Sequence, residues 1–422
     1  MSKVAIIGAG YVGLTTAVCF AHLGHEVICA DIDPDRVDRL QRGEVPIVEA
    51  GLEAMMAEGL RNGRLRFVLG AEVAAEGCEF VYLCVPTPQG EDGSADLSYI
   101  VTAATSIAPV VTSESIVINK STVPVGSTKV VEKALGRSDV SVVSNPEFLR
   151  EGSAIHDFLH PDRIVIGSDD QAAAIRVATL YLGVPAPLIV TNPASAETIK
   201  YAANAFLATK ISFVNAVAAV CEAVGADVND VVLGIGYDKR IGQEFLKPGP
   251  GWGGSCFPKD TRAMVHIAES AGYDFELLRG VISVNDQQRE RVVSKIIDAA
   301  GGSLQGRLVA MWGLTFKART DDLRESPSLA VAHRLVEEGA VVRGYDPTVT
   351  TALPGIEIAD NAYDACEGAD VLAVLTEWDE FRWLDADKVG AAMNSRTVVD
   401  ARNLLDRSAF IRAGFEFQGI GR

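Results

Sequence analysis

The first residues in this chain that could do chemistry form a glycine-rich turn. They follow an apolar run that begins at Val4 and precede a helical pattern, in the order Gly8, Ala9, Gly10, Tyr11, Val12, Gly13. The first glycine permits a tight turn, the second lets a pyrophosphate approach the backbone, and the third lets helix and strand pack closely. Asp31 ends the next apolar run, where a carboxylate binds ribose hydroxyls and repels a 2′-phosphate. The pattern predicts binding of NAD and not NADP, with a purely structural turn as the alternative.

Cys256 is the second candidate, and its surroundings differ from those of the other six cysteines. It follows a Gly-Gly-Ser run and precedes Pro258, a residue that suits the first turn of a helix. A helix N-terminus and the nearby Lys259 both favour the thiolate over a thiol of ordinary pKa, about 8.5. We therefore expect a nucleophile. An inert buried thiol is the alternative, and Lys259 with Asp260 could be a charge pair without a chemical role.

The third candidate is a pair of polar residues in a long helical pattern. Lys200 and Asn204 are four residues apart, so their side chains leave the same face of a helix and can reach one substrate oxygen. A cation and an amide donor together suit a developing alkoxide. An exposed polar stripe on the helix is the alternative interpretation.

The elements that must position these residues follow from the hydrophobic pattern. Short apolar runs alternate with helical patterns, and the expected strands are 4–7, 27–30, 65–68, 80–85, 116–119, 140–144, 163–166 and 188–190. Continuous apolar strands separated by helices predict a parallel sheet covered on both faces. Asn192 and Pro193, a capping residue and a first helical residue, then open a helix expected to run to about Gly225.

The strand and helix pattern returns in the last third of the chain. Strands are expected at 308–312, 341–345, 371–375 and 397–400, with a helix near 327–338. We therefore predict an α/β fold with two Rossmann-like doubly wound domains, joined by a long central helix and a helical dimerisation segment. The expected domains are residues 1–192, 193–300 and 301–422.

Composition excludes several classes of protein. The 422 residues suffice for two or three domains, and the formal net charge of -18 disfavours nucleic acid as a partner. The seven cysteines form neither a disulfide framework nor a paired metal-ligand spacing, so we expect no metal site. A strand pattern that starts at Val4 leaves no room for a signal peptide, and the apolar stretch from Tyr201 to Cys221 is too polar for a lipid span. We expect a cytoplasmic protein that does not enter a membrane.

Several separated motifs together resemble the UDP-glucose/GDP-mannose dehydrogenase family. The resemblance extends from residue 4 to about residue 405 and is carried by the fingerprint turn and by the segments 120–126, 145–152, 240–242, 249–260 and 314–327. The segment Gly253–Asp260 resembles the UDP-glucose 6-dehydrogenase branch more than the branch that acts on N-acetylated mannose.

The resemblance implies a four-electron oxidation of a nucleotide-sugar C6 alcohol to a carboxylate with two NAD+. Cys256 would form a thiohemiacetal and then a thioester, which water hydrolyses. Glu147 matches the base for that water, and Thr122 would lie nearby. Lys200, Asn204 and Asp260 match groups that stabilise oxyanions and manage protons.

The resemblance also assigns binding residues and an assembly. The cofactor contacts it implies are Gly8, Gly10, Tyr11, Val12, Gly13, Asp31, Arg36, Pro86, Thr87, Thr122, Glu151, Lys259 and Arg324. The substrate contacts it implies are Phe148, Leu149, Arg150, Lys200, Asn204, Arg240, Phe245, Lys247, Gly253, Phe316, Lys317 and Arg402. In this family Arg240 would be donated by a second subunit, so a homodimer or a larger homo-oligomer is expected. The third domain, 301–422, would bind the nucleotide sugar.

Three alternatives to oxidation of UDP-glucose remain open at this point. The same chemistry on dTDP-glucose or GDP-mannose would use the same groups. A two-electron hydroxyacid dehydrogenase shares the nucleotide-binding domain and a long helix with Lys-x-x-x-Asn, but it needs no thiol. A sensor that binds NAD or a nucleotide sugar without turnover would lack the nucleophile or the base, whereas Cys256 and Glu147 are both present.

Overall fold

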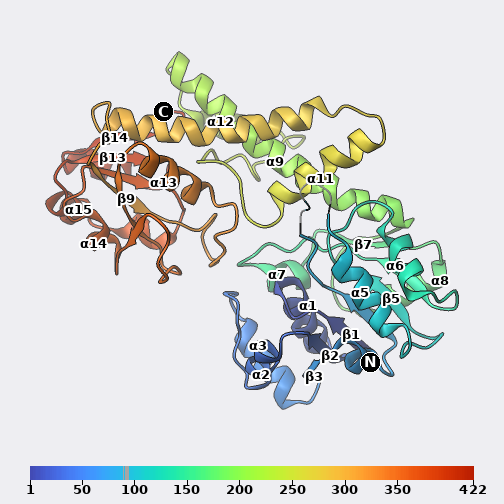
Figure 1. The fold of residues 1–422 in the computed structure, drawn as a ribbon. Helices are drawn as coiled ribbons and strands as arrows, with labels where there is room; N and C mark the ends of the chain where they lie inside the picture. The colour runs from blue at the N-terminus through green and yellow to red at the C-terminus, as the bar shows by residue number, and fades with distance from the viewer. Residues whose placement is uncertain (89, 91–94) are drawn as a thin grey trace. The chain divides into compact units, whose positions relative to one another are not determined.

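A computed structural model describes residues 1–88, 90 and 95–422 of the chain (Figure 1). These residues divide into two compact units, 1–203 and 204–422. Each unit has its own sheet, in which all pairings but one are parallel, and its own buried apolar clusters. The α/β fold with two Rossmann-like sheets that the sequence predicts is confirmed.

The first unit contains an eight-stranded sheet in the order β3-β2-β1-β4-β5-β6-β7-β8. The order of its first six strands is that of a dinucleotide-binding fold. Its strands lie within a few residues of the predicted runs, at β1 Lys3–Ile7, β2 Glu26–Asp31, β3 Leu65–Leu69, β4 Phe80–Leu83, β5 Ile116–Asn119, β6 Ser141–Ser144, β7 Ile164–Gly167 and β8 Leu188–Thr191.

One pairing in this sheet departs from the predicted parallel arrangement. β6 and β7 pair in the antiparallel sense at Ser144 and Gly167. A parallel neighbour requires a crossover to the other end of the sheet, whereas the connection 145–163 stays at the edge where β6 ends. The sequence motif at 145–152 therefore lies at the carboxyl edge of the sheet, the edge that also carries the glycine-rich turn after β1.

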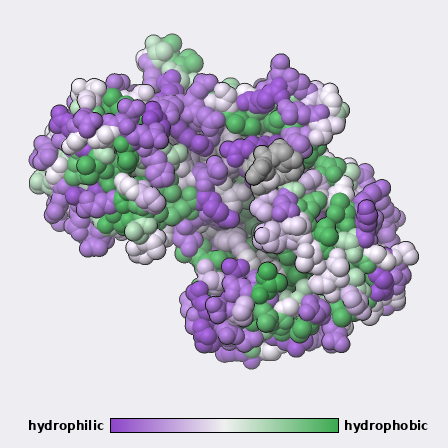
Figure 2. All heavy atoms as spheres, in the orientation of Figure 1, coloured by the Kyte–Doolittle hydropathy of each residue, from purple (hydrophilic) through white to green (hydrophobic). Residues whose placement is uncertain are grey.

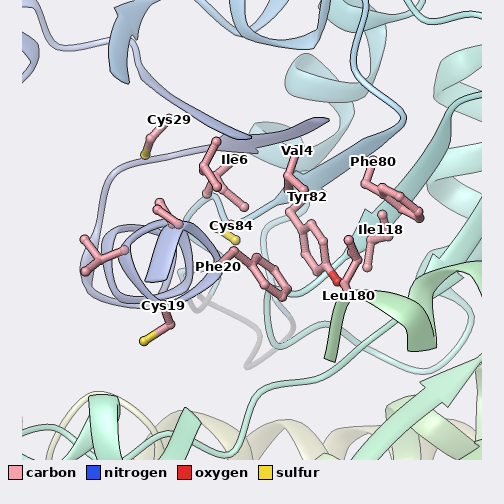
Figure 3. Packing of buried hydrophobic residues seen from close by; sticks show 14 of the residues in the cluster. Val4, Ile6, Cys19, Phe20, Cys29, Phe80, Tyr82, Cys84, Ile118 and Leu180 are labelled. Carbon is pink, nitrogen blue, oxygen red and sulfur yellow. The ribbon is translucent and has the colours of Figure 1, made fainter. Parts of the chain in front are cut away.

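Helices cover both faces of the first sheet. They are α1 Tyr11–His22, α2 Pro34–Gln41, α3 Leu52–Arg61, α4 Ala71–Ala75, α5 Ser98–Ile107, α6 Ser127–Leu135, α7 Ala154–Leu159, α8 Gln171–Ala178 and the short 3-10 helix η1 Thr179–Tyr181. On one face the ring of Phe20 from α1 packs beside the ring of Tyr82 from β4, with centroids 5.3 Å apart (Figure 3). Helices α4, α5 and α6 supply a second apolar cluster.

The second unit contains a six-stranded parallel sheet in the order β11-β10-β9-β12-β13-β14. Its strands are β9 Leu308–Trp312, β10 Val341–Tyr345, β11 Ile356–Ile358, β12 Val371–Val374, β13 Thr397–Asp400 and β14 Glu416–Gly419. The sequence did not predict the two edge strands. β11 has only three residues, and β14 has no β-branched residue, so neither has the pattern of a strand.

The remaining helices of the second unit precede, separate or follow these strands. They are α10 Val228–Gly236, α11 Phe257–Ser270, α12 Glu276–Ala299, α13 Pro327–Glu337, α14 Ala362–Cys366, the 3-10 helix η2 Asp379–Trp383, α15 Ala386–Ala392 and α16 Arg407–Arg412. The helix predicted near 327–338 is therefore confirmed as α13.

The long predicted helix is confirmed as α9, Pro193–Val224. It starts as expected, because the side chain of Asn192 accepts a hydrogen bond from Ser195 N at 2.8 Å. Within the described part of the chain, α9 is the one helix long and apolar enough to cross a membrane, a test that core helices also pass.

Candidate active site

The glycine-rich turn lies between β1 and α1 and leaves room for a phosphate. Gly8 has φ of 101°, and a Cβ added there would lie 2.6 Å from Cys84 O. A Cβ added at Gly13 would lie 1.8 Å from Gly8 O, so helix and strand touch. A Cβ at Gly10 would meet no atom within 4 Å. The space beside Gly10 and the start of α1 fit a pyrophosphate.

Asp31 and Arg36 lie at the end of β2, where an adenosine ribose binds in this fold. Asp31 Oδ2 accepts a hydrogen bond from Ala9 N at 2.9 Å and lies 3.4 Å from Arg36 Nη1. The carboxylate thus offers acceptors for ribose hydroxyls, and the neighbouring cation is paired with it. These groups fit NAD.

Tyr11 connects the turn to two other segments. Its hydroxyl donates to the carboxylate of Glu49 and accepts from Gly152 N at 2.8 Å. Burial, together with Glu49, raises the pKa of Tyr11. The tyrosine therefore stays neutral and holds the turn against the end of the segment 145–152.

Glu147 and Lys200 form a buried ion pair in the first unit. Lys200 Nζ lies 2.8 Å from Glu147 Oε1, and their side chains are 5% and 4% exposed. Glu147 Oε2 accepts from Leu149 N at 2.5 Å. Burial acts to raise the pKa of Glu147, but Lys200, the Leu149 amide and the charge of Lys120 outweigh it and lower the pKa. Glu147 is therefore ionised and able to accept a proton.

Lys120 is a second buried lysine near this pair, and its role was not predicted from the sequence. Its Nζ lies 3.3 Å from Asn145 Oδ1 and 3.4 Å from the hydroxyl of Tyr181. The rings of Tyr82, Phe158 and Tyr181 surround it at 5.8 to 6.0 Å. The sequence does contain a sign of this role, since Lys120 directly follows an apolar strand. A lysine is buried in such a place only when polar or aromatic groups stabilise its charge.

Thr122 lies in the segment between β5 and α6, and neighbouring polar groups hold this segment. Thr87 Oγ1 donates to Thr122 O at 2.8 Å, and Ser121 Oγ donates to Val85 O at 2.7 Å. Pro86, beside Thr87, is exposed. The predicted cofactor residues Pro86, Thr87 and Thr122 therefore lie in adjoining segments.

Glu197 lies on α9 and connects this helix to the segment before α6. Its role was not predicted from the sequence. It is 2% exposed and lies three residues before Lys200. Its carboxylate accepts from Gly126 N at 2.6 Å and from Thr128 N and Oγ1 at 2.9 and 2.8 Å. These donors belong to the first turn of α6, where a carboxylate satisfies unpaired amides.

The other predicted substrate residues of this unit follow Glu147 directly. The guanidinium of Arg163 lies 3.6 Å from the centre of the Phe148 ring, and Lys200 Nζ lies 5.5 Å from it. Arg150 pairs with Asp157 at 2.6 Å. Leu149 is the donor to Glu147, and Glu151 is half-buried in the same segment.

In the second unit Cys256 occupies the N-cap of α11, as the sequence predicts. Its carbonyl accepts from Asp260 N at 2.8 Å, which closes the first turn of the helix. Ser255 Oγ lies 3.5 Å from Cys256 Sγ. Cys256 is half-buried, whereas the other six cysteines are buried.

Asp260 is fully buried and receives two partners. Asn204 Nδ2 donates to Asp260 Oδ2 at 2.6 Å, and Lys259 Nζ lies 2.8 Å from Asp260 Oδ1. The charge pair Lys259–Asp260 therefore exists, but Asn204 from α9 shares it. An amide, a carboxylate and an ammonium thus gather one turn after the thiol.

Close backbone contacts join the cysteine segment to the loop after β9. A Cβ at Gly253 would lie 2.0 Å from Glu325 O, and one at Gly254 would lie 2.8 Å from the ring of Phe316. Gly254 N donates to Arg324 O at 3.1 Å. The predicted residues Gly253, Phe316 and Arg324 are therefore brought together, with Lys317 Nζ 5.6 Å from the Phe316 ring centre.

Arg402 contacts the same loop. Its Nη2 donates to Phe316 O at 3.3 Å and its Nε to Leu375 O at 2.8 Å, and Glu377 lies 3.0 Å from the guanidinium. The predicted Phe245 has φ of 62°, and its ring lies 6.3 Å from that of Phe257, the first residue of α11. Backbone strain at a non-glycine residue is common at functional sites.

Two of the predicted substrate residues lie on the surface of the chain. Lys247 is exposed, and Arg240 has an 89% exposed side chain that pairs with Asp238 at 2.6 Å. Among the residues that the structure describes, no cluster of three metal-ligating side chains occurs.

Comparison with known proteins matches three ranges of the chain to sequence models of the UDP-glucose/GDP-mannose dehydrogenase family. The NAD binding domain matches 2–184, the central domain 194–287 and the UDP binding domain 310–407. UDP-glucose 6-dehydrogenase of Rhizobium meliloti (strain 1021) is 45% identical and covers 100% of this chain and 99% of that protein. UDP-glucose 6-dehydrogenase TuaD of Bacillus subtilis (strain 168) is 44% identical over 100% of this chain and 94% of that protein.

A solved structure shows the same fold. A UDP-glucose dehydrogenase from the hyperthermophilic archaeon Pyrobaculum islandicum superposes with a TM-score of 0.92 at 38% identity. The match covers 100% of this chain and 98% of that chain.

Proposed function

Because this chain belongs to the UDP-glucose/GDP-mannose dehydrogenase family, we propose that it oxidises the C6 alcohol of UDP-glucose to the carboxylate of UDP-glucuronate. The oxidant is NAD, two molecules for each sugar. The observation that carries the proposal is Cys256 at the N-terminus of α11, with Asn204 and Asp260 beside its first turn. A two-electron hydroxyacid dehydrogenase has no use for that thiol.

The cofactor contributes one kind of chemistry, the acceptance of a hydride in each of the two oxidations. The turn from Gly8 to Gly13 would hold its pyrophosphate in the space beside Gly10, and Asp31 would bind its ribose hydroxyls. The match of residues 2–184 to an NAD binding domain supports this assignment.

The thiol of Cys256 converts the aldehyde into a form that can lose a second hydride. As a thiolate it adds to the carbonyl carbon, and the carbonyl oxygen becomes an oxyanion that Lys200 and Asn204 stabilise and that then takes up a proton. Departure of the second hydride from the carbon, together with loss of that proton from the oxygen, leaves a thioester on Cys256. The aldehyde stays bound to the chain throughout, which keeps its carbon oriented.

Glu147 acts in the last step. Its lowered pKa keeps it ionised at neutral pH, so it can take a proton from water as the water attacks the thioester carbonyl. The C–S bond then breaks, the thiolate of Cys256 is restored, and the sugar leaves as a carboxylate. Thr122 is proposed to orient the water, and Asp260 to manage protons near the thiol.

The remaining contacts divide between the two ligands. For the cofactor we propose Tyr11, Val12, Arg36, Pro86, Thr87, Thr122, Glu151, Lys259 and Arg324. For the substrate we propose Phe148, Leu149, Arg150, Phe245, Lys247, Gly253, Phe316, Lys317 and Arg402, with Arg240 from a second subunit. Residues 1–192, 193–300 and 301–422 are the corresponding NAD-binding, central and nucleotide-sugar domains.

A homodimer is proposed from the surface of α9 and α10. Phe206, Phe213 and Val220 recur every seven residues on α9 and are 65%, 55% and 59% exposed, and Leu233 and Tyr237 are also exposed. Figure 2 shows hydrophobic surface at its top, over the light-green helical segment of Figure 1. An exposed apolar stripe of this kind marks an interface.

We propose a cytoplasmic location from the state of the cysteines. No disulfide joins the cysteines of the described chain, which agrees with a reducing cytoplasm. The net charge of -18 argues against nucleic acid as a partner.

The decisive experiment offers UDP-glucose, dTDP-glucose, GDP-mannose and UDP-N-acetylhexosamines separately and counts NADH formed per sugar. We expect two NADH per UDP-glucose and no accumulation of free aldehyde. A ratio near one would contradict the covalent four-electron mechanism. Preference for another sugar at a ratio of two would retain the mechanism and correct the substrate.

A further inference from the structure

Four buried polar side chains on two helices of the second unit face the loop that leads to Cys256. Ser212 and Asn215 lie on α9, and Asn285 and Gln288 lie on α12. They are between 1% and 3% exposed. Within each pair the spacing is three residues, which places both members on one face of their helix.

These side chains supply hydrogen bonds to the loop backbone. Asn215 Oδ1 accepts from Gly249 N at 2.9 Å, and Gln288 Nε2 donates to Gly249 O at 2.8 Å. Asn285 makes two bonds to one residue, accepting from Trp252 N at 2.8 Å and donating to Trp252 O at 3.0 Å. The amide of Asn285 thus pairs with Trp252 as a strand backbone would.

The loop needs these partners because its sequence prevents it from forming a helix or a strand. Pro248 and Pro250 have no N–H, and the loop forms neither helix nor strand. Buried backbone groups without partners are costly. Gly251 has φ of 123°, and a Cβ there would lie 2.8 Å from Asn285 Oδ1, so this glycine allows the asparagine to approach.

The side chain of Trp252 is held as well. Its Nε1 donates to Ser212 Oγ at 2.9 Å, and that hydroxyl donates to Val281 O at 2.8 Å. Trp252 is therefore attached through backbone and indole to both helices, four residues before Cys256. Gly253 and Gly254, which lie between Trp252 and Cys256, closely contact the loop after β9. The backbone from Trp252 to Cys256 therefore has little freedom to move.

We propose that Asn285 and Gln288 are positioning residues for Cys256, because they fix the backbone from Gly249 to Trp252 and so set where the thiol stands at the start of α11. They touch no substrate. A misplaced nucleophile reacts slowly even when its chemistry is intact, because orientation supplies much of the rate. The inference rests on the proposed role of Cys256 and deepens it.

The test uses the full chain and the variants Asn285→Asp and Gln288→Met. The aspartate has the same shape, but it sets a carboxylate oxygen against Trp252 O in place of the amide donor. Gln288→Met removes the hydrogen bond from Gln288 to Gly249 O and is the milder change. Gln287→Glu is the matched control on the exposed side of α12. Val292→Ala, one turn farther along α12 and buried in an apolar cluster, controls for lost stability.

Two measurements are made on each variant. The first is the rate at which iodoacetamide alkylates Cys256 without substrate, followed by peptide mass spectrometry, since the other cysteines are buried. The second is kcat and KM with UDP-glucose and NAD. We expect Asn285→Asp to change the alkylation rate at least about fivefold and to lower kcat about tenfold or more, with the KM for NAD nearly unchanged. Gln288→Met should shift both rates in the same direction by less.

The controls decide the outcome. Val292→Ala should lower Tm but keep the alkylation rate, and Gln287→Glu should match the parent. The proposal is overturned if Asn285→Asp or Gln288→Met, whichever folds, alkylates and turns over at the parent rate. It is also overturned if Val292→Ala changes alkylation as much at an equal loss of Tm. Because alkylation needs no substrate, a parent enzyme inactive on UDP-glucose would contradict the proposed function and leave the positioning test valid.

Discussion

The carboxylate of Glu147 and the ammonium of Lys200 lie 2.8 Å apart with almost no exposure to water. Each buried charge is therefore stabilised by the opposite charge of its partner. Glu147 has further support from the amide of Leu149 and from Lys120. In the proposed reaction this second cation would compensate part of the charge of Glu147 while Lys200 turns toward a substrate oxyanion.

Replacing Lys200 by methionine should expose this dependence. A buried carboxylate that loses its partner costs about 3 to 5 kcal/mol of unfolding free energy. We expect such a loss at pH 7 in urea denaturation, and a smaller one in the double variant Lys200→Met/Glu147→Gln. In the parent the lowered pKa of Glu147 means that its stabilising charge is present above the unfolded value, about 4.3, and is lost as the pH falls through the folded value. Equal stability of the single and double variants would contradict a compensated pair.

Replacing Cys256 by alanine should abolish formation of the sugar acid. The thiol belongs to the second unit, whereas the glycine-rich turn belongs to the first, so the affinity for NAD should stay within about twofold of the parent. Product analysis and an NAD titration test both parts. Glucuronate formation at the parent rate would show that Cys256 is not the nucleophile.

The variant Glu147→Gln should slow hydrolysis of the thioester more than the hydride transfers. A neutral amide cannot accept the proton of the attacking water, and both hydride transfers come before that demand. Mass spectrometry of protein quenched during turnover should therefore find the chain carrying the acyl group. Only unmodified chain during slow turnover would assign Glu147 to an earlier step.

Mixing two inactive variants should restore activity if Arg240 serves the neighbouring subunit. Chains with Arg240→Ala and chains with Cys256→Ala are allowed to exchange. Half of the dimers are then mixed, and each mixed dimer has one site with both residues intact, so about a quarter of the parent activity should return. Differently tagged chains verify the exchange. No recovery after complete exchange would place Arg240 in the site of its own chain.

The sequence predicts the elements whose local pattern decides their structure. The glycine-rich turn, the cap at Asn192 and the start of α11 at Cys256 each depend on a few neighbouring residues, and all three are found. The antiparallel pairing of β6 with β7 depends on where the chain returns in space, which no local pattern records.

The residues that position the site were harder to predict for a related reason. Asn285 and Gln288 are polar residues in a helical pattern, and such residues are mostly exposed. Their burial is determined by a loop more than thirty residues earlier in the chain, whose prolines leave backbone groups without partners. Glu197 was missed in the same way, because its donors are in α6.

The ion pair between Asp31 and Arg36 has a consequence for cofactor engineering. A site that accepts NADP needs a cation for the 2′-phosphate, and this chain already carries one, restrained by the neighbouring carboxylate. Redesign toward NADP therefore starts with removal of a negative charge and not with installation of a positive one. The end of β2 is therefore the place where a single substitution tests whether the cofactor preference of this chain can be inverted.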